Sequence, residues 1–381
     1  MPSLLVLPPL ALSFTGSALL LWAARLMRRR AAARDPAPPQ PAPAISLLKP
    51  LHGAEPQLRA NLASALNEDY PGAIEMICGV ARADDPAAAV ARALPVRLVI
   101  DPRPWGSNAK VSNLANIAVA ATHDILVLAD SDMAVPRDYC ARLTGALAEP
   151  GIGAVTCLYV GRGDTGFWSR LVAAGIDSHF VPASEIGLAT GLGHPCMGST
   201  IALRRETLEA IGGFAAFADT LADDHAIGAA VRATGARVAV PAMVLVHGCA
   251  ETSFAALVRQ ELRWAATIAG IDPAGHAGSI VLHPLPLAIL GWLIGGGTAG
   301  AAAVLLALVA RAAVSLAAAR LDFAGRNARQ RLAGLALIPL RDLLSFGLFV
   351  ASFAVRSVDW RGTSLNLGRD GALSPRKDQG L

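Results

Sequence analysis

Charge is scarce in this chain and absent from two long stretches. Of the 381 residues, 16% are Asp, Glu, Lys or Arg, whereas 54% are hydrophobic, and the mean hydropathy is +0.46. Residues 1–24 contain no ionisable side chain, and no Asp, Glu, Lys or Arg lies between Asp272 and Arg311. This composition argues against an ordinary soluble enzyme and indicates membrane segments joined to a globular part.

Two kinds of motif are also missing. The five cysteines show no CxxC or metal-ligand spacing and are odd in number, so we expect reduced thiols in the core. The P-loop pattern, GxxxxGK followed by Ser or Thr, does not occur. The glycine-rich GWLIGGGTAG follows no predicted strand and lies in an apolar segment, which indicates close helix packing rather than a phosphate loop.

The first apolar segment, residues 1–27, has its positive charge at its C-terminal end. Arg25 lies near that end, and Arg28, Arg29 and Arg30 follow it. A secretory signal peptide carries its charge before the apolar core, so the reversed order predicts a retained membrane anchor. About 20 apolar residues can span a bilayer, and the arginines favour the cytoplasmic side. The basic, proline-rich residues 28–44 are predicted to form a stiff linker.

A second membrane element is predicted near the C-terminus. The uncharged stretch there is too long for one span, so residues 271–320 are interpreted as a transmembrane hairpin that turns at GWLIGGGTAG. The hairpin returns the chain to a second basic cluster, formed by Arg320, Arg326, Arg329 and Arg331. Both basic clusters therefore predict the same side of the membrane.

The last apolar segment, residues 332–355, is interrupted by polar residues. It contains Pro339 and the adjacent pair Arg341 and Asp342. Charges at that depth must face protein, water or head groups rather than lipid tails. The sequence leaves open whether this segment spans the membrane, re-enters it or lies in the interface. Residues 356–381 form a polar tail.

The net charge of +4 and the pI near 9.0 indicate that the chain binds an anionic partner, either lipid or nucleic acid. Much of the arginine lies beside the membrane segments, which favours anionic lipid over nucleic acid as its partner. We therefore predict a multi-pass membrane protein whose globular part lies in the cytoplasm.

Residues 45–270 have the character of a globular domain. Short apolar runs (ISLLK, IEMICGV, VRLVI and DILVLAD) alternate with stretches of helical composition, which indicates βαβ units and a mainly parallel sheet. Such sheets bind ligands at the carboxyl ends of their strands. Acidic residues occur there: Asp84 and Asp85 follow the second run, and Asp130 and Asp132 follow the fourth.

The aspartates of LADSD repel each other at the end of an apolar strand. Asp130 and Asp132 can be held there by one hard divalent cation, Mg²⁺ or Mn²⁺, which removes their repulsion. Because Mg²⁺ sites commonly combine one or two carboxylates with substrate phosphates, a nucleoside diphosphate would complete the coordination. The alternative is an exposed turn with two solvated aspartates.

Two further signals lie downstream. LADDHAIG places Asp223 and Asp224 where a helix begins, so they are either helix caps or contain a general base. In RQELRW, Gln260, Arg263 and Trp264 would share one helix face and could bind a diphosphate or a sugar. The alternative for RQELRW is an interfacial helix that leads into the membrane.

Together these residues resemble the family 2 type glycosyltransferases with a GT-A fold, and more closely their ceramide glucosyltransferase branch. The resemblance rests on SLLKPLHGAEPQLRANLASALNEDYPG, ADDP, NAKVSNL, ADSD, GSTIALRRETL, ADDHAI, QELRW and VDWRG, in that order. Within the branch, GAVTCLYVGR, HPLPLAIL and PLRDLLSF are similar to bacterial hopanoid-biosynthesis glycosyltransferases. It covers residues 45–362. The implied fold is a Rossmann-like α/β domain with a mainly parallel sheet, plus N- and C-terminal transmembrane helices.

The resemblance implies a set of donor-binding residues. Asp85 matches the aspartate that contacts uridine, and Asn108 and Lys110 match the stretch near the donor diphosphate. Asp130 and Asp132 match the metal and diphosphate motif. Lys110 is one of only three lysines in the chain.

The resemblance also implies the residues that act on the acceptor. Asp224 matches the catalytic base, and Gln260, Arg263 and Trp264 match the QxxRW motif at the acceptor and diphosphate. In an inverting hexosyl transfer, Asp224 would deprotonate a lipid hydroxyl while the cation stabilises the departing UDP. One carboxylate then acts on the reacting bonds, unlike the paired acids of a hydrolase.

Several substrates remain open at this stage. Relatives imply transfer of N-acetylglucosamine from a UDP donor to the hopanoid bacteriohopanetetrol. The alternative is a ceramide glucosyltransferase with the same mechanism and a different lipid pocket. A polysaccharide synthase normally needs more spans than are predicted here, and a non-catalytic scaffold would have lost one of the family carboxylates.

Overall fold

The computed structural model describes residues 4–355, 357–360, 363–367 and 373–375, the side chains only up to residue 355. The chain divides into two compact units. The sheet unit comprises residues 33–159, 194–250 and 371–381, and the helical unit comprises residues 1–32, 160–193 and 251–370.

The sheet unit is built on seven strands in the order β3-β2-β1-β4-β8-β6-β9. Their bounds are β1 (Ile45–Pro50), β2 (Ile74–Val80), β3 (Arg97–Ile100), β4 (Ile125–Leu128), β6 (Ile152–Thr156), β8 (Ile201–Arg204) and β9 (Arg237–Ala239). The pairs β1/β2, β1/β4, β2/β3 and β6/β9 are parallel, whereas β8 runs antiparallel to β4 and to β6. The strand order reverses between β1 and β4, which is where such sheets bind ligands.

Helices cover both faces of this sheet. One apolar core contains residues of α2 (Leu58–Leu66), α3 (Pro86–Arg92) and α5 (Tyr139–Leu147), and the other contains residues of α4 (Ala109–Ala118), α8 (Arg205–Ala210) and α9 (Asp223–Ala233). All six residues of β1 are buried, with Leu47 in the first core and Leu48 in the second. Burial on both faces explains why β1 is apolar without alternation. All five cysteines are free and buried, as predicted.

Smaller elements complete the sheet unit. They are η3 (Phe214–Phe217), β5 (Met133–Ala134) and β10 (Val244–Cys249), and β5 pairs antiparallel with β10. β7 (Leu158–Gly163) begins in the sheet unit and ends in the helical unit. β13 (Leu373–Pro375) also belongs to the sheet unit.

The predicted linker, residues 28–44, is helical at its start, because α1 (Leu7–Ala32) continues through the arginines to Ala32. The remainder is attached to the sheet unit at Asp35 and Pro43. The carboxylate of Asp35 accepts hydrogen bonds from the backbone N–H groups of Ala242 (2.5 Å) and Met243 (3.0 Å). The Tyr70 hydroxyl donates to the carbonyl oxygen of Pro43 at 2.6 Å. Residues 35–43 are therefore packed against the sheet unit instead of acting as a free spacer.

Among its described residues, the helical unit contains three segments long and apolar enough to cross a membrane: Leu4–Ala32, Pro284–Leu321 and Ala328–Ser352. The first contains η1 (Leu4–Val6) and α1 (Leu7–Ala32), the second α12 (Pro284–Gly291), η5 (Trp292–Gly296) and α13 (Gly297–Leu321), and the third α14 (Ala328–Ser352). The other elements are α6 (Phe167–Gly175), η2 (Ile176–Phe180), α7 (Val181–Thr190), α10 (Phe254–Ile271), α11 (Pro273–Gly278), η4 (Ser279–Leu282), β11 (Ser357–Trp360) and β12 (Thr363–Leu367).

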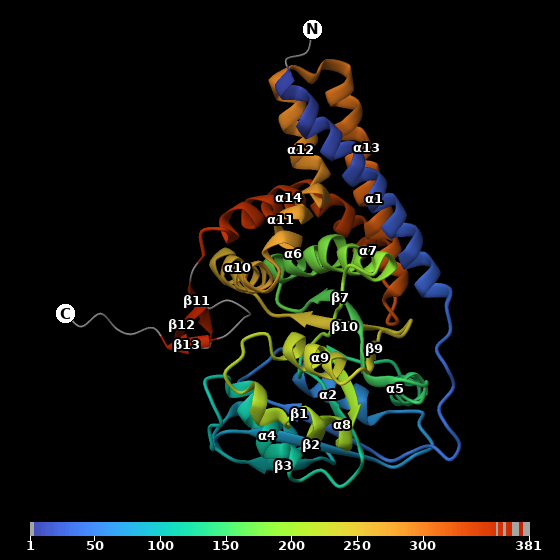
Figure 1. Cartoon of the computed structure of the whole chain (residues 1–381), viewed down its shortest axis with the longest axis vertical. Helices are drawn as coiled ribbons and strands as arrows, with labels where there is room; N and C mark the ends of the chain where they lie inside the picture. Colours follow the sequence, from blue (N-terminus) through green and yellow to red (C-terminus); the bar gives the residue numbers. More distant parts are fainter. Residues whose placement is uncertain (1–3, 356, 361–362, 368–372, 376–381) are drawn as a thin grey trace, which may run out of the picture. The chain divides into compact units, whose positions relative to one another are not determined.

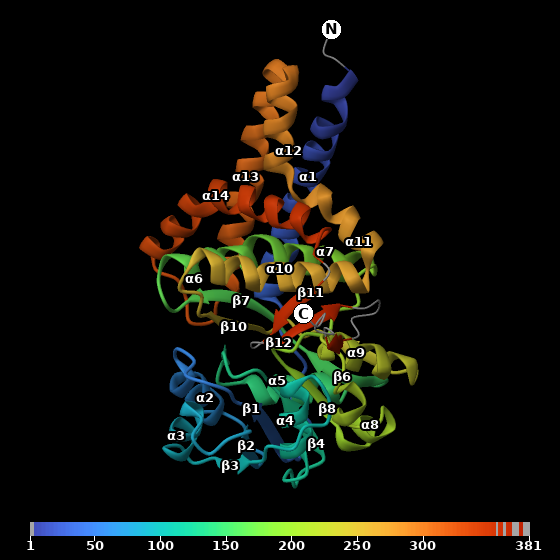
Figure 2. The same cartoon turned by 90° about the vertical axis from the view of Figure 1, so that its left-hand side faces the viewer.

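The reversal between α12 and α13 depends on glycine. Gly295 has φ 113° and Gly297 has φ 51°, conformations that residues with a Cβ rarely adopt. A Cβ on Gly300 would lie 2.6 Å from the Cα of Trp292, so this glycine also permits close helix contact. α12 and α13 run beside α1, whereas α10 and α14 cross their direction (Figures 1 and 2).

The motif VDWRG near the C-terminus is described only in part, because its last two residues, 361–362, lie outside the described residues.

Candidate active site

The two aspartates of ADSD follow β4, at the edge where the strand order reverses. Lys49, at the end of β1, donates from Nζ to the backbone carbonyl of Asp130 at 3.0 Å. Asn61 of α2 donates to the carbonyl of Ser131 at 3.2 Å, and Gly248 of β10 donates to the carbonyl of Asp132 at 2.8 Å. Three neighbouring elements therefore hold the backbone of this turn in place.

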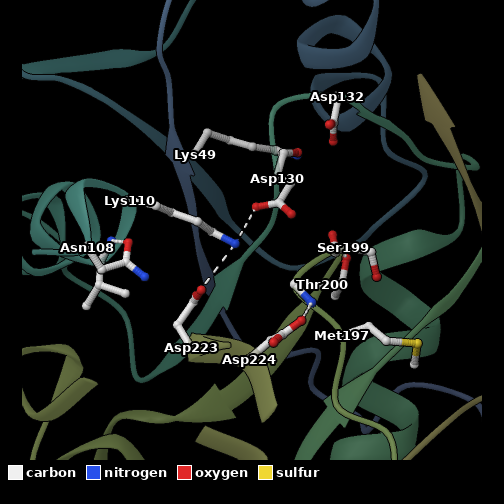
Figure 3. Close-up of polar contacts among 12 residues, drawn as sticks. Lys49, Asn108, Lys110, Asp130, Asp132, Met197, Ser199, Thr200, Asp223 and Asp224 are labelled. Carbon is white, nitrogen blue, oxygen red and sulfur yellow. Dashed lines mark hydrogen bonds and ion pairs between the residues drawn. The ribbon is translucent and has the colours of Figure 1, made fainter. Parts of the chain in front are cut away.

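Lys110 joins this turn to the start of α9. Its Nζ lies 2.6 Å from Oδ1 of Asp130 and 3.6 Å from Oδ2 of Asp223 (Figure 3). Lys110 lies in the first turn of α4, and that turn is capped by Asn108. Asn108 is fully buried, its Oδ1 accepts from the N–H of Val111 at 3.0 Å, and its Nδ2 donates to the carbonyl of Thr220 at 2.8 Å. Asn108 thus holds the helix end from which Lys110 extends.

Asp224 is held by backbone donors and does not cap α9. Its Oδ2 accepts from the N–H of Gly198 at 2.8 Å and its Oδ1 from the N–H of His225 at 2.7 Å. Ala222 occupies the N-cap position of α9, and no side chain caps it. Asp223 and Asp224 are therefore not helix caps, contrary to that alternative. Asp224 lies half-buried in the first turn of the helix.

Three of the predicted site residues converge on Gly198. A Cβ at that position would lie 2.9 Å from Nζ of Lys110, 3.2 Å from Oδ2 of Asp130 and 3.5 Å from Oδ2 of Asp224. Figure 3 shows these side chains pointing toward one another from three separate elements. Since a side chain at position 198 would occupy the space between them, glycine keeps the centre of the cluster open.

The charges of the cluster are strongly coupled. Burial acts to lower the pKa of Lys110, but the charges of Asp130, Asp223 and Asp224 outweigh it and raise that pKa, so the ammonium stays charged. Burial raises the pKa of Asp130, although Lys110 opposes this. Burial also raises the pKa of Asp223, to about 6. Lys110 thus lies beside two carboxylates, Asp130 and Asp223, and the charge of Asp224 also raises its pKa.

His247, on β10, is a site residue that the sequence did not reveal. Its Nε2 lies 3.2 Å from Oδ2 of Asp132, and its ring lies against that of Tyr159 with centroids 5.3 Å apart. Burial acts to lower the pKa of His247, but Asp132 outweighs it and raises that pKa well above its ordinary value. Burial would raise the pKa of Asp132, but His247 lowers it overall. The only sequence signal was one polar residue within the apolar run VLVHGC.

Lys49 was missed as well, although lysine is rare in this chain. It is buried at the end of the apolar β1, and burial lowers its pKa. Two of the three lysines therefore belong to this site. A charged residue that terminates an otherwise apolar strand was the available signal.

Asp85 contributes to a neighbouring loop. It is the N-cap of α3, where its Oδ1 accepts from the N–H of Ala87 at 2.8 Å and from the N–H of Gly53 at 2.9 Å. His52 lies 3.4 Å from its Oδ2. Asp85 thereby ties the loop after β1 to the loop after β2, and both follow carboxyl ends of strands.

The QxxRW residues belong to α10 of the helical unit. Nη2 of Arg263 donates to Oε1 of Gln260 at 3.2 Å, and the residue between them, Glu261, is buried. Gln260, Arg263 and Trp264 are half-buried. Their role at the acceptor and diphosphate stays a prediction.

The turn after β4 has free acceptor atoms for a cation. Oδ1 of Asp132 is buried and accepts no hydrogen bond within the described residues, and Oδ2 of Asp130 faces Gly198. Nowhere among the described residues do three or more His, Cys, Asp or Glu side chains form a group with metal-binding geometry. The side chains therefore fit a cation that takes its remaining ligands from water and a bound diphosphate, not a cage made by protein alone.

Comparison with solved structures defines the class of the fold. The mannosyltransferase PcManGT of Pyrobaculum calidifontis, solved with GDP-Man and Mn²⁺, superposes with a TM-score of 0.50 at 20% identity. The similarity covers 91% of this chain and 98% of that one. The chain therefore has a GT-A-like glycosyltransferase fold with a mainly parallel sheet, as expected from the sequence.

Comparison of sequences identifies the family. The family described as Glycosyl transferase family 21 matches residues 9–373, and the chain belongs to it. Ceramide glucosyltransferase of Komagataella phaffii is 33% identical over 123 residues, which are 29% of this chain and 24% of that protein. Ceramide glucosyltransferase 1 of Caenorhabditis elegans is 23% identical over 234 residues, 58% of this chain and 49% of that protein. The matches thus span about a quarter and about half of these two relatives.

Proposed function

We propose that this glycosyltransferase is a membrane-bound, inverting enzyme that moves a sugar from a UDP donor to a hydroxyl group of a lipid. The observation that carries the proposal is the convergence of Lys110, Asp130 and Asp224 on the open position beside Gly198. Within one small volume, this convergence brings together a base (Asp224), a positively charged ammonium group (Lys110) and a carboxylate (Asp130) that could bind a diphosphate through a divalent cation.

Asp224 is the general base in this proposal. Its carboxylate is fixed by the N–H groups of Gly198 and His225, so it can be directed at an acceptor hydroxyl. The proton of the hydroxyl passes to Asp224 while the hydroxyl oxygen attacks the anomeric carbon. The bond from that carbon to the diphosphate oxygen breaks, and UDP departs with the electron pair. Attack from the face opposite UDP inverts the anomeric centre.

Lys110, together with a cation that Asp130 and Asp132 would hold, would stabilise the leaving group. Asp130 and Asp132 would hold the cation, with His247 beside Asp132. When bound, a Mg²⁺ or Mn²⁺ ion neutralises charge that develops on the diphosphate. Lys110 remains charged beside Asp130 and adds a second positive group. Asp85 would contact the uridine.

The acceptor is proposed to be a lipid because the family relatives are ceramide glucosyltransferases and the chain has three candidate membrane spans. Within that class we favour transfer of N-acetylglucosamine to bacteriohopanetetrol, on the phrases GAVTCLYVGR, HPLPLAIL and PLRDLLSF. Ceramide with UDP-glucose is the second candidate, favoured by the names of the two relatives. In both cases the sheet unit would work on the cytoplasmic side of a bacterial inner membrane.

The test uses the purified full chain in lipid vesicles. Each of the donors UDP-N-acetylglucosamine and UDP-glucose is offered with each of the acceptors bacteriohopanetetrol and ceramide, and lipid products are identified by mass spectrometry. Glycosylated hopanoid alone supports the favoured pair, whereas glucosylceramide alone supports the second. No lipid product from any combination, with unchanged protein stability, would contradict lipid transfer.

Metal dependence is tested in the same assay. Chelation with EDTA should stop transfer, and added Mn²⁺ or Mg²⁺ should restore it. Transfer that continues at the same rate after chelation would remove the cation from the proposal while leaving Asp224 in place.

A further inference from the structure

α14 has an inverted distribution of polar and apolar residues. Its buried positions recur every three or four residues and therefore share one face. They are Ile338, Arg341, Asp342, Ser345, Leu348, Phe349 and Ser352. The opposite face carries exposed apolar side chains, with fractional exposures of 66% for Leu332, 49% for Leu340, 47% for Leu343 and 53% for Val350. Arg329 and Arg331, in the first turn, are exposed, but the charges in the middle of the helix, Arg341 and Asp342, are buried. A helix that hides its central charges and exposes apolar residues along the opposite face is adapted to lipid, not to water.

The hidden charges of α14 are paired with other elements of the helical unit. Arg341 contacts Glu261 of α10 through both guanidinium ends, at 2.6 and 2.5 Å. Asp342 lies 2.6 Å from Nε of Arg311 in α13 and 3.0 Å from Nε2 of His179 in η2. α14 is thereby bound to α10 along its middle.

α14 crosses the helices that are suited to span the membrane. Figures 1 and 2 show α1 and α13 running in one direction, with α14 and α10 lying across that direction and in contact with each other. If α1 and α13 follow the membrane normal, α14 lies close to the membrane plane. Its length and composition alone would allow a span, so only its direction and its contacts separate the two arrangements.

A spanning α14 would place several charges at the wrong depth. Arg341 and Asp342 lie in the middle of the helix and would reach the bilayer centre, where charged groups are costly. Glu261 is paired with Arg341, so α10, which also carries Arg259 and Arg263, would be carried into the hydrocarbon region with them. An in-plane helix avoids this cost because its charged face rests on protein.

We propose that α14 does not cross the bilayer but lies in the plane of one leaflet, with Leu332, Leu340, Leu343 and Val350 in contact with the lipid acyl chains. The chain then crosses the membrane three times: through α1, through residues 279–296 (η4, α12 and η5 together, about 27 Å at 1.5 Å per residue) and through α13. The C-terminus emerges on the side that carries the arginines after α1. The exposed apolar face of α14 is continuous with the lipid-facing helices of the same unit. We therefore infer that this face contacts a membrane leaflet and not another protein. The inference does not depend on the reaction proposed above.

Spin-label depth measurements test the arrangement. Single cysteines replace Leu332, Leu340, Leu343 or Val350 of the full chain, which is labelled and reconstituted in phosphatidylcholine and phosphatidylglycerol vesicles. Depth is read from the relative accessibility to oxygen and to a water-soluble nickel reagent. Leu305, Val309 and Leu316 of α13 serve as controls because they are also exposed. The unsubstituted chain measures any labelling of the five buried cysteines.

The two arrangements predict different depth profiles. Eighteen residues separate Leu332 from Val350, about 27 Å along a helix, which nearly equals the hydrocarbon thickness of about 30 Å. An in-plane α14 gives four labels at one shallow depth, about 5–10 Å below the head groups, while the α13 labels change depth steadily. A maximum of depth near Leu340 with shallow ends would overturn the proposal. Labels shielded from both reagents would also overturn it, because they would indicate a second copy or another protein.

Reporter fusions to the C-terminus of the full chain give an independent test. Green fluorescent protein should fluoresce and alkaline phosphatase should be inactive, as for a cytoplasmic terminus. The opposite pair of signals would mean that α14 crosses the membrane.

Discussion

Both units bury charged side chains, but they balance them differently. Among the described residues of the helical unit, the two buried arginines each have a matching carboxylate, Arg341 with Glu261 and Arg311 with Asp342. The half-buried Arg326 and Arg30 are likewise paired, with Asp177 and Glu185. In the sheet unit the charges are shared: Lys110 lies beside both Asp130 and Asp223, while Lys49 and His247 adjoin the turn that carries Asp130 and Asp132. One-to-one pairs hold helices together, whereas a cluster of shared charges that leaves Oδ1 of Asp132 without a hydrogen bond keeps the capacity to bind a cation. We propose that this difference separates the structural pairs from the candidate site.

The largest effect should follow from the base. Asp224→Asn keeps an oxygen for the N–H of Gly198, gives up the acceptor for the N–H of His225 and cannot accept the proton of the acceptor, so the transfer rate should fall by about 10²–10⁴-fold. Thermal unfolding should change little. Initial rates of lipid glycosylation measure the effect, with the exposed Asp84→Asn as a control that retains activity. Near-normal activity of Asp224→Asn would remove Asp224 from the mechanism.

The space at the centre of the cluster can be probed separately. Gly198→Ala would bring a methyl group to 2.9 Å from Nζ of Lys110, displacing Lys110 or Asp130. A shift of about 1 Å in such a site can cost up to about 100-fold in rate. Gly278→Ala is the matched control, since nothing lies within 4 Å of its Cβ position. Equal rates for the two variants would contradict the proposed use of this space.

The helical unit should respond in stability, not in chemistry. Arg341→Met leaves Glu261 buried without its partner, which should lower the free energy of unfolding by about 3–5 kcal/mol. The double variant Arg341→Met with Glu261→Gln should recover most of that loss because no lone charge remains. Thermal unfolding in detergent measures both. If the single and double variants are equally unstable, the pair acts through packing and not through charge.

Much of the sheet unit could be predicted from sequence because its strands are short apolar runs separated by helical stretches. The aspartates after β4 and at the start of α9 were recognisable because motif spacing is local. Lys49 and His247 were not, since each becomes a site residue only through a strand neighbour distant in sequence. The inverted face of α14 was also hidden, because which side of a helix is buried depends on partners such as Glu261 and Arg311.

The smallest expected effect concerns a carboxyl group outside both clusters. Burial raises the pKa of Glu68 from 4.5 to about 8, and the nearby Asp138 and Asp69 act in the same direction. Because the pKa of Glu68 is raised in the folded state, the folded protein favours the protonated form of this side chain. The contribution of protonated Glu68 to the free energy of unfolding is therefore complete below about pH 4.5 and is lost as the pH rises through about 8.

Glu68→Gln should remove this pH dependence. Its side-chain oxygen can still accept from the N–H of Cys140, which contacts Glu68 at 3.2 Å in the wild type. The variant should melt a few degrees above the wild type at pH 9 and at nearly the same temperature at pH 5. Glu209→Gln, at an exposed position, should follow the wild type throughout. A stabilisation of Glu68→Gln that is the same at both pH values would show that ionisation of Glu68 is not its cause.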